Sequence, residues 1–229
     1  MQTRTYGDLF KLIQSLAGVR NFAFTGNLSG SPSGEAFSEQ DNVANLINRR
    51  YFEAYQTSQM WPRYLVVGEE RTIESGQVVP YAETGKNTIG EFIRIHRQQP
   101  FLNNSTLEFD FYVDSSGAHI MDISTADTSS AYVTYKKEFT PFTTSDDTST
   151  EPFSNYTTSN EEVPSEFFNF IAHTAYADFL RMDGQTDKAL IEEATGKKYL
   201  DLELERVDLI TNNNNVNKRF STYVSRQAR

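Results

Sequence analysis

The spacing of apolar residues changes twice along this chain, and this change constrains the fold more than any other feature of the sequence. Apolar residues recur at helical spacing up to about residue 62, alternate with polar residues up to about residue 140, and return to helical spacing from about residue 163. Side chains repeat every ~3.6 residues around a helix and every ~2 residues along a strand. The sequence therefore predicts two helices, then a β-region, then two more helices.

Two helices are expected in the first quarter of the chain. The first begins with a capping box at Thr5 and Asp8 and stops at Gly18. The second begins at Ser38 and carries an apolar stripe typical of an amphipathic helix. We expect it to end near Trp61, because the residue before a proline is disfavoured in the α region.

Six short strands are expected between residues 63 and 140. Turn signals such as Glu74-Ser75-Gly76 separate them, and no connection is long enough for a parallel crossover, so the sheet is expected to be antiparallel. Alternation is clearest from Leu107 to Val113, which places Val113 in the core. The expected strands are Tyr64–Glu69, Gln77–Tyr81, Ile93–His96, Leu107–Val113, His119–Ile123 and Ala131–Lys136.

Helical spacing returns after a polar segment. Residues 141–162 are rich in Thr, Ser, Asp, Asn and Pro and are expected to form a loop or linker, since they bury too little apolar surface to offset their chain entropy. A helix is expected from Pro164 to Gly184, followed closely by another from Asp187 to Leu209, which makes an antiparallel hairpin. The residues expected to face inward in the last helix are Leu190, Ala194, Leu200, Leu204 and Val207.

The fold class that follows is α+β: a four-helix bundle interrupted by an antiparallel β-sheet or sandwich insertion, with an extended C-terminal tail. With 229 residues, 38% of them hydrophobic, the chain can bury a core of one or two domains. The bundle would comprise residues 1–62 and 163–211, and the β-domain residues 63–140. Residues 141–162 would be the Ser/Thr-rich loop, and residues 212–229 a basic arm.

Charge is divided unevenly along the chain. The formal net charge is −10, which argues against a broad basic face that wraps nucleic acid. The asparagines at 212–215 are expected to end the last helix, and the following segment carries +4 with no acidic residue. This composition, interleaved with aromatic residues, is typical of an arm that orders on a partner, the alternative being a disordered solvated tail. The residues assigned to binding in this arm are Lys218, Arg219, Phe220, Tyr223, Val224, Arg226 and Arg229.

The sequence offers little catalytic chemistry. There is no cysteine, and the only glycine-bracketed serine segment has Pro32 where a nucleophile would stand. Among the acids Glu69, Glu70, Glu108 and Asp110, only the last two share a strand face, as a glycosidic pair would, and a solvated face is the simpler interpretation. With 17 Phe and 12 Tyr, the composition favours subunit contact over catalysis. No catalytic, cofactor-binding or metal-binding residue is assigned.

The three histidines lie far apart in the sequence. His173 is on an amphipathic helix and is expected to be structural, whereas His96 alternates with core residues and is expected to face solvent or a neighbouring subunit. His119 follows a Ser-Ser-Gly turn and has no partner at metal-ligand spacing. Together they make a weak case for a metal site.

No run of about 18 apolar residues is present, and the N-terminus lacks the layout of a signal peptide. We therefore expect synthesis in the cytosol and no membrane contact.

Five stretches of the sequence resemble the head-to-tail adaptor proteins of short-tailed bacteriophages, also called tail tubular protein A or neck proteins. The resemblance covers about residues 5–209 and lies in residue pattern and element order. The stretches are Asn48–Tyr55, Trp61–Arg71, Phe92–Arg97, Val133–Lys137 and Pro164–Asp187.

The resemblance implies a structural virion protein without enzymatic activity or cofactor. Such proteins form a ring, expected here to be a dodecamer, between the portal protein and the tail nozzle protein, at the neck of a particle assembled in the host cytoplasm. DNA passes through the channel without specific binding. An acidic lining favours this passage, because it has no basic groups that would bind phosphate. The arm at 212–229 would grip the portal, and the β-domain would face the nozzle.

Net negative charge opposes assembly in solution, so a monomer is expected until the portal supplies a template. Two alternatives stay open. The first is a glycan-binding or host-contacting module of a viral tail, and the second is a hydrolase that uses Glu108 and Asp110.

Overall fold

The computed structural model describes residues 4–18, 39–81, 83, 85–100, 108–121, 129–142 and 161–227, with the backbone alone for residues 39–41 and 209–227. The fold is α+β, with four helices and antiparallel sheets in the described ranges. The chain divides into two compact units, a helical unit of Met1–Thr57 with Pro141–Arg229 and a β unit of Ser58–Thr140. The expected boundaries were residues 62/63 and 140/141.

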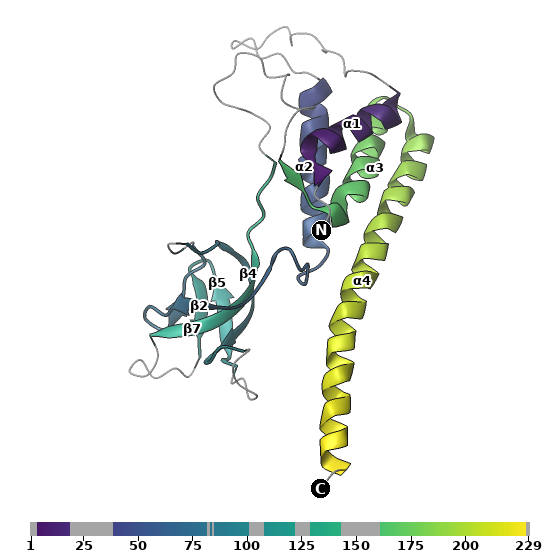
Figure 1. Ribbon diagram of the computed structural model, residues 1–229. Coiled ribbons are helices and arrows are strands. Elements are labelled where there is room, and N and C mark those ends of the chain that lie inside the picture. Colours follow the sequence, from purple (N-terminus) through teal and green to yellow (C-terminus); the bar gives the residue numbers. More distant parts are fainter. Residues whose placement is uncertain are drawn as a thin grey trace, which may run out of the picture. The chain divides into compact units, whose positions relative to one another are not determined.

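In the helical unit, α3 packs against each of the other three helices (Figure 1). The capping box at the start of α1 is confirmed, since Thr5 Oγ1 accepts the Asp8 N–H at 3.1 Å and the Asp8 carboxylate accepts the Thr5 N–H at 3.3 Å. Gly18 ends α1 with φ 69°, as expected. The elements of this unit are β1 (Arg4–Thr5), α1 (Tyr6–Ala17), α2 (Glu39–Gln56), β8 (Glu162–Val163), α3 (Ser165–Met182) and α4 (Thr186–Gln227).

Helix α2 ends at Gln56, so the prediction that it continues to Trp61 is wrong. Thr57 directs both its N–H and its hydroxyl, the latter at 2.7 Å, to the carbonyl of Ala54, which closes the last turn. Trp61 instead belongs to the β unit, where it is buried and its carbonyl accepts the N–H groups of Tyr64 and Leu65. Proline set only an outer limit for the helix.

The beginning of the polar segment at 141–162 is part of the core. Phe142 is buried, with its ring 4.4 Å from that of Tyr51 and 5.3 Å from that of Tyr6. The Asn48 amide donates to the Phe142 carbonyl at 3.1 Å and accepts its N–H at 2.9 Å. Residues 141–142 are irregular, as expected of a loop, but the burial of Phe142 contradicts the expectation that the segment stays out of the core, and its last residue, Glu162, is part of β8. Residues 143–160 lie outside the described residues.

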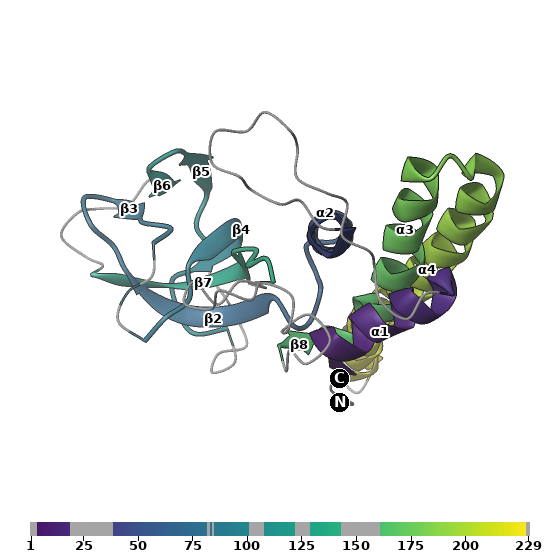
Figure 2. The same cartoon turned by 90° about the horizontal axis from the view of Figure 1, so that it is seen from above.

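In the β unit, two three-stranded antiparallel sheets have the orders β2-β7-β4 and β3-β6-β5 (Figure 2). The antiparallel prediction is confirmed. Both sheets contribute to one hydrophobic core, which includes Val78, Ile95, Ala118, Val133 and Tyr135. The strands are β2 (Leu65–Thr72), β3 (Gln77–Val78), β4 (Ile89–His96), β5 (Phe111–Asp114), β6 (Gly117–Ile120) and β7 (Ser130–Lys137).

Two strand residues differ in exposure from the prediction. Val113 is 54% exposed, although alternation placed it in the core, and His96 is only 4% exposed. The ladder between β4 and β7 is regular from Arg94 to His96, so Ile95 and His96 point to opposite faces of the strand, and both are buried. Burial lowers the pKa of His96.

Helix α4 is continuous through Asn212–Asn215 to Gln227, so the prediction of an extended tail after an asparagine break is wrong. Asparagine costs a helix only about 0.7 kcal/mol or less, and no glycine or proline follows Gly196. At about 1.5 Å per residue the 42 residues of α4 span about 63 Å, against about 27 Å for the 18 residues of α3. Its C-terminal half therefore continues past the start of α3 (Figure 1). No helix in the described ranges is long and apolar enough to cross a membrane.

Candidate functional site

Helix α4 is the candidate functional element, and a close approach to α3 fixes its first half. A Cβ added at Gly196 would lie 2.7 Å from Thr174 Cγ2 and 3.3 Å from the Phe170 carbonyl oxygen, so glycine lets the two helices meet. The residues of α4 buried on this side are Ala189, Gly196, Leu200 and Val207. The predicted inward residues Leu200 and Val207 are confirmed as buried, whereas Leu190 and Ala194 are exposed, because the buried stripe starts at Ala189.

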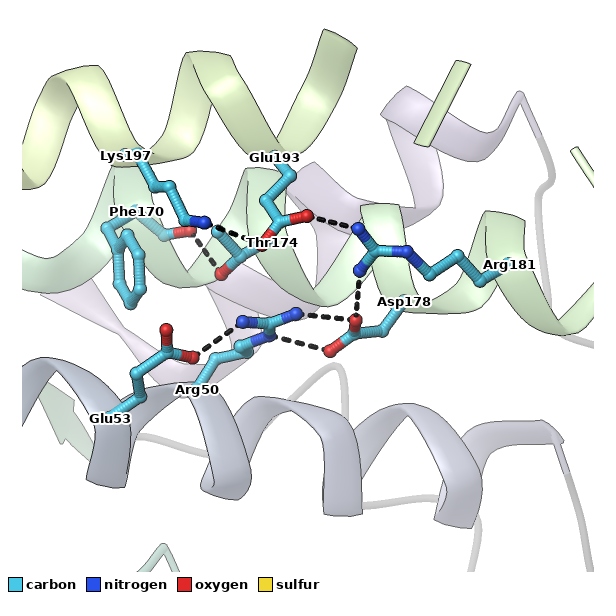
Figure 3. Close-up of polar contacts among 8 residues, drawn as sticks. All are labelled: Arg50, Glu53, Phe170, Thr174, Asp178, Arg181, Glu193 and Lys197. Carbon is cyan, nitrogen blue, oxygen red and sulfur yellow. Dashed lines mark hydrogen bonds and ion pairs between the residues drawn. The ribbon is translucent and has the colours of Figure 1, made fainter. Parts of the chain in front are cut away.

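A network of charged side chains ties α2, α3 and α4 together (Figure 3). The Arg50 guanidinium of α2 donates through Nε and Nη2 to both carboxylate oxygens of Asp178 on α3, each at 2.6 Å. Arg181 donates from Nη1 to Asp178 at 2.9 Å and from Nη2 to Glu193 on α4. Lys197 lies 3.0 Å from the other oxygen of Glu193. Asp178 therefore binds two arginines. Arg50 links it to α2, and Arg181 links it to α4 through Glu193.

Burial makes this network sensitive to the loss of any one member. Arg50 and Asp178 are 6% and 7% exposed. Burial opposes the charge on Arg50, but its hydrogen bonds to Asp178 and Glu53 raise its pKa above the ordinary value. The hydrogen bonds from Arg181 and Lys197 lower the pKa of Glu193 to about 2. A buried pair adds little net stability but is costly to break, so the network holds the first turns of α4 against α3.

Glu193 should make the helical unit sensitive to acid. Because its pKa falls from 4.5 in the unfolded chain to about 2 in the folded one, the ion pair stabilises fully above pH 4.5 and is lost as the pH falls towards 2. We expect the wild type to melt at a higher temperature than Glu193→Gln at neutral pH, with the difference shrinking steadily below pH 4.5. Thermal melts followed by circular dichroism measure it, and a difference independent of pH would contradict it.

The other side of α4 is apolar and exposed near its start. Ile191 is 67% exposed, Leu202 49% and Tyr199 39%. The Tyr199 ring stacks on that of His173 at 5.5 Å, and His173 Nδ1 lies 2.7 Å from Glu192 Oε2. His173 thus has the structural contacts that the sequence predicted. It covers part of Tyr199, whereas Ile191 and Leu202 remain exposed.

The residues assigned to binding in the arm stand on α4, not on an extended tail. The positions Lys218 to Arg226 are part of the helix, and Arg229 lies outside the described residues. Sequence reasoning therefore found the segment but gave it the wrong local structure. No protein-family model matches this chain, and no curated protein matches it significantly. The geometry of α4 has to carry the functional argument.

One cluster in the β unit has the residue types of a catalytic triad but not its geometry. His119 Nε2 lies 3.0 Å from Asp114 Oδ2 and 3.2 Å from Ser116 Oγ. A triad needs the acid and the nucleophile on opposite ring nitrogens, whereas both are on Nε2 here. The Ser116 hydroxyl also donates to Asp114 at 2.6 Å, and this bond lowers the pKa of Asp114 to about 2. The cluster closes the β5–β6 turn.

The acid pair considered for glycosidic chemistry is exposed at both positions. Glu108 Oε1 lies 3.3 Å from Arg94 Nη1, and the Asp110 side chain is open to solvent. A general acid needs a desolvated site, so this arrangement does not favour the hydrolase. Among the described residues, no group of three His, Asp or Glu could hold a metal ion.

Sequence reasoning missed a buried arginine in the β unit. Arg71 is fully buried and bonds Glu69 at 2.7 Å, the Tyr135 hydroxyl at 2.8 Å and the carbonyls of Tyr81 and Asn87. It thereby anchors both ends of the connection between β3 and β4. The i, i+2 spacing of Glu69 and Arg71 on one strand face was the available signal.

Proposed function

We propose that this protein is a head-to-tail adaptor, a structural virion component that forms a ring between a portal and a tail nozzle and lets the genome pass. The observation that carries the proposal is α4, which the Arg50–Asp178–Arg181–Glu193 network holds at its start and which continues to Gln227. In this proposal the four helices act as one bundle that aims α4 at the portal. The β unit faces the nozzle.

The distribution of charge supports this assignment. The segment 212–229 has a formal charge of +4. Since the whole chain has a charge of −10, the remaining residues together have a charge of −14. A basic helix suits an acidic groove between portal subunits, where Lys218, Arg219 and Arg226 would form ion pairs and Phe220 and Tyr223 would bury apolar area. The acidic remainder gives passing DNA no sites of counterion release.

Portal rings mixed with variants of the arm test the proposal. Lys218→Glu combined with Arg219→Glu is expected to weaken binding at least about tenfold, which corresponds to about 1.4 kcal/mol, because it reverses the charge of the arm. The matched control is Lys188→Glu with Lys198→Glu, which makes the same change on exposed residues of the first half of α4. Co-sedimentation with the rings measures binding. Unchanged loading of the arm variant, or of a chain truncated after residue 211, would refute the assignment.

One observation favours the glycan-binding alternative. Tyr112 on β5 is 55% exposed, and its ring stacks on that of His119 with a centroid distance of 4.8 Å, which fixes its orientation. Asp114, which pairs with His119, lies in the same hairpin. A fixed exposed ring is what the apolar face of a sugar can pack against. Binding on a glycan array that disappears in Tyr112→Ala would support this reading, and no binding by the wild-type chain would exclude it.

A further inference from the structure

The sequence of α4 carries a second stripe of mostly apolar positions, offset from the buried positions Gly196, Leu200 and Val207. Starting at the exposed residues Tyr199 and Leu202, the stripe advances by alternating steps of three and four, and six of its eight positions are apolar, the exceptions being Arg206 and Asn213. On a continuous helix such a seven-residue repeat stays on one side, and it is the repeat of helices that pair with helices. The positions of this stripe are Tyr199, Leu202, Arg206, Leu209, Asn213, Val216, Phe220 and Tyr223.

The charges of α4 change sign along the stripe. The stretch from Asp201 to Asp208 contains four acids and one base, and the stretch from Lys218 to Arg226 contains three bases and no acid. Two such helices in parallel would place base against base and acid against acid. Two helices in antiparallel orientation place the acidic stretch of each against the basic stretch of the other, which is the arrangement that charge favours.

The stripe also fits itself in this orientation. Reversing one helix about Thr211 places Leu202 opposite Phe220 of the partner subunit and Tyr199 opposite Tyr223 of the partner subunit. In the same register Glu205 flanks the seam next to Arg219 of the partner subunit. Two polar positions lie near the centre of the seam, where Asn213 meets Leu209 of the partner subunit and Arg206 meets Val216 of the partner subunit. Polar residues at such positions set the register at some cost in stability.

We propose that α4 is a self-docking surface, through which two copies of this chain pair by antiparallel α4 helices related by a two-fold axis near Thr211. Such an interface is isologous and closes on itself. This proposal does not depend on the adaptor function. It predicts a dimer in solution, in place of the monomer that net charge alone led us to expect. If the protein is an adaptor, the pair covers the segment that binds the portal, so the portal has to displace the second copy.

Molar mass in solution, measured by light scattering on the full chain, tests the pairing. The wild type is expected to have twice the chain mass, and Leu202→Glu to have the mass of one chain with unchanged helical circular dichroism. Leu190→Glu is the matched control, because Leu190 is 56% exposed on the same helix but off the stripe, and it should remain paired. A wild type of single mass, or a pair that survives Leu202→Glu, would overturn the proposal.

Cross-linking tests the orientation. The chain has no cysteine of its own, so two single-cysteine variants, Leu202→Cys and Phe220→Cys, can be mixed and oxidised with a copper catalyst in air. Antiparallel pairing predicts a disulfide between the two variants in the mixture and little between identical chains. Disulfides mainly between identical chains would indicate parallel pairing and refute the register. Neither readout involves a portal, so failure here is distinct from failure of the proposed function.

Discussion

Replacing Asp178 with alanine is expected to lower the free energy of unfolding of the helical unit by about 3–5 kcal/mol. The substitution leaves the buried Arg50 guanidinium without either of its 2.6 Å hydrogen bonds to a carboxylate, and Arg181 loses one partner as well. Arg50 then keeps only Glu53, whose side chain is 43% exposed, and a buried charge that loses its buried partner is among the costly defects that a single change can make. Urea unfolding followed by helical circular dichroism measures the effect.

The matched control for Asp178→Ala is Glu203→Ala. Glu203 pairs with Arg206, whose side chain is 70% exposed, within α4. An exposed pair of this kind contributes about 1 kcal/mol or less. Equal effects of the two substitutions would show that the three-helix network does not hold the unit together.

Gly117→Ala is expected to destabilise the β unit by about 3 kcal/mol or more, because backbone strain and steric overlap add. Gly117 has φ 142°, and a Cβ there would lie closer than 3.0 Å to the carbonyl oxygen of Val78 on the neighbouring strand. That oxygen belongs to the ladder between β3 and β6 and cannot move without breaking it. The fluorescence of Trp61, the single tryptophan and a buried residue of this unit, reports its unfolding.

Gly85→Ala separates the two causes. Gly85 also has a positive φ, of 79°, but nothing lies within 4 Å of its added Cβ, so only the backbone strain of about 1–3 kcal/mol applies. We expect Gly117→Ala to shift the Trp61 transition clearly more than Gly85→Ala. Both should leave the helical circular dichroism transition nearer to the wild type than Asp178→Ala does. A smaller effect at Gly117 than at Gly85 would contradict the steric argument.

Local signals in the sequence predicted the starts and turns of several elements correctly. The capping box at Thr5, the stop at Gly18 and the turn at Glu74-Ser75-Gly76 are all present. In that turn Ser75 and Gly76 both have positive φ, as a two-residue hairpin requires. Each of these features depends on residues within a few positions of one another, which is why the sequence alone is sufficient.

The candidate site was predicted only in part, for the same reason. The basic, aromatic composition of 218–226 marked a segment suited to binding, and that assignment stays a prediction. Its helical form was missed, because asparagine is only a weak helix breaker and α3 holds the first half of α4 in place. Leu190 was wrongly predicted to face inward. Periodicity shows that a helix has an apolar side, but where two apolar stripes are present it does not show which of them packs against α3.

The sequence by itself determined the order of the main elements, two helices, then strands, then two helices, and the antiparallel sense of the sheets, because periodicity and loop length are properties of neighbouring residues. It did not predict the short pair β1–β8, which joins residues far apart in the chain. Only the tertiary structure decided which polar residues are buried. Arg50 and Asp178 meet across 128 positions of the chain, and His96 is buried on the face of β4 that alternation predicted to be exposed. Charged and imidazole side chains are usually exposed, because their burial is costly. Whether such a side chain is buried depends on segments far away in the sequence, which local patterns do not describe.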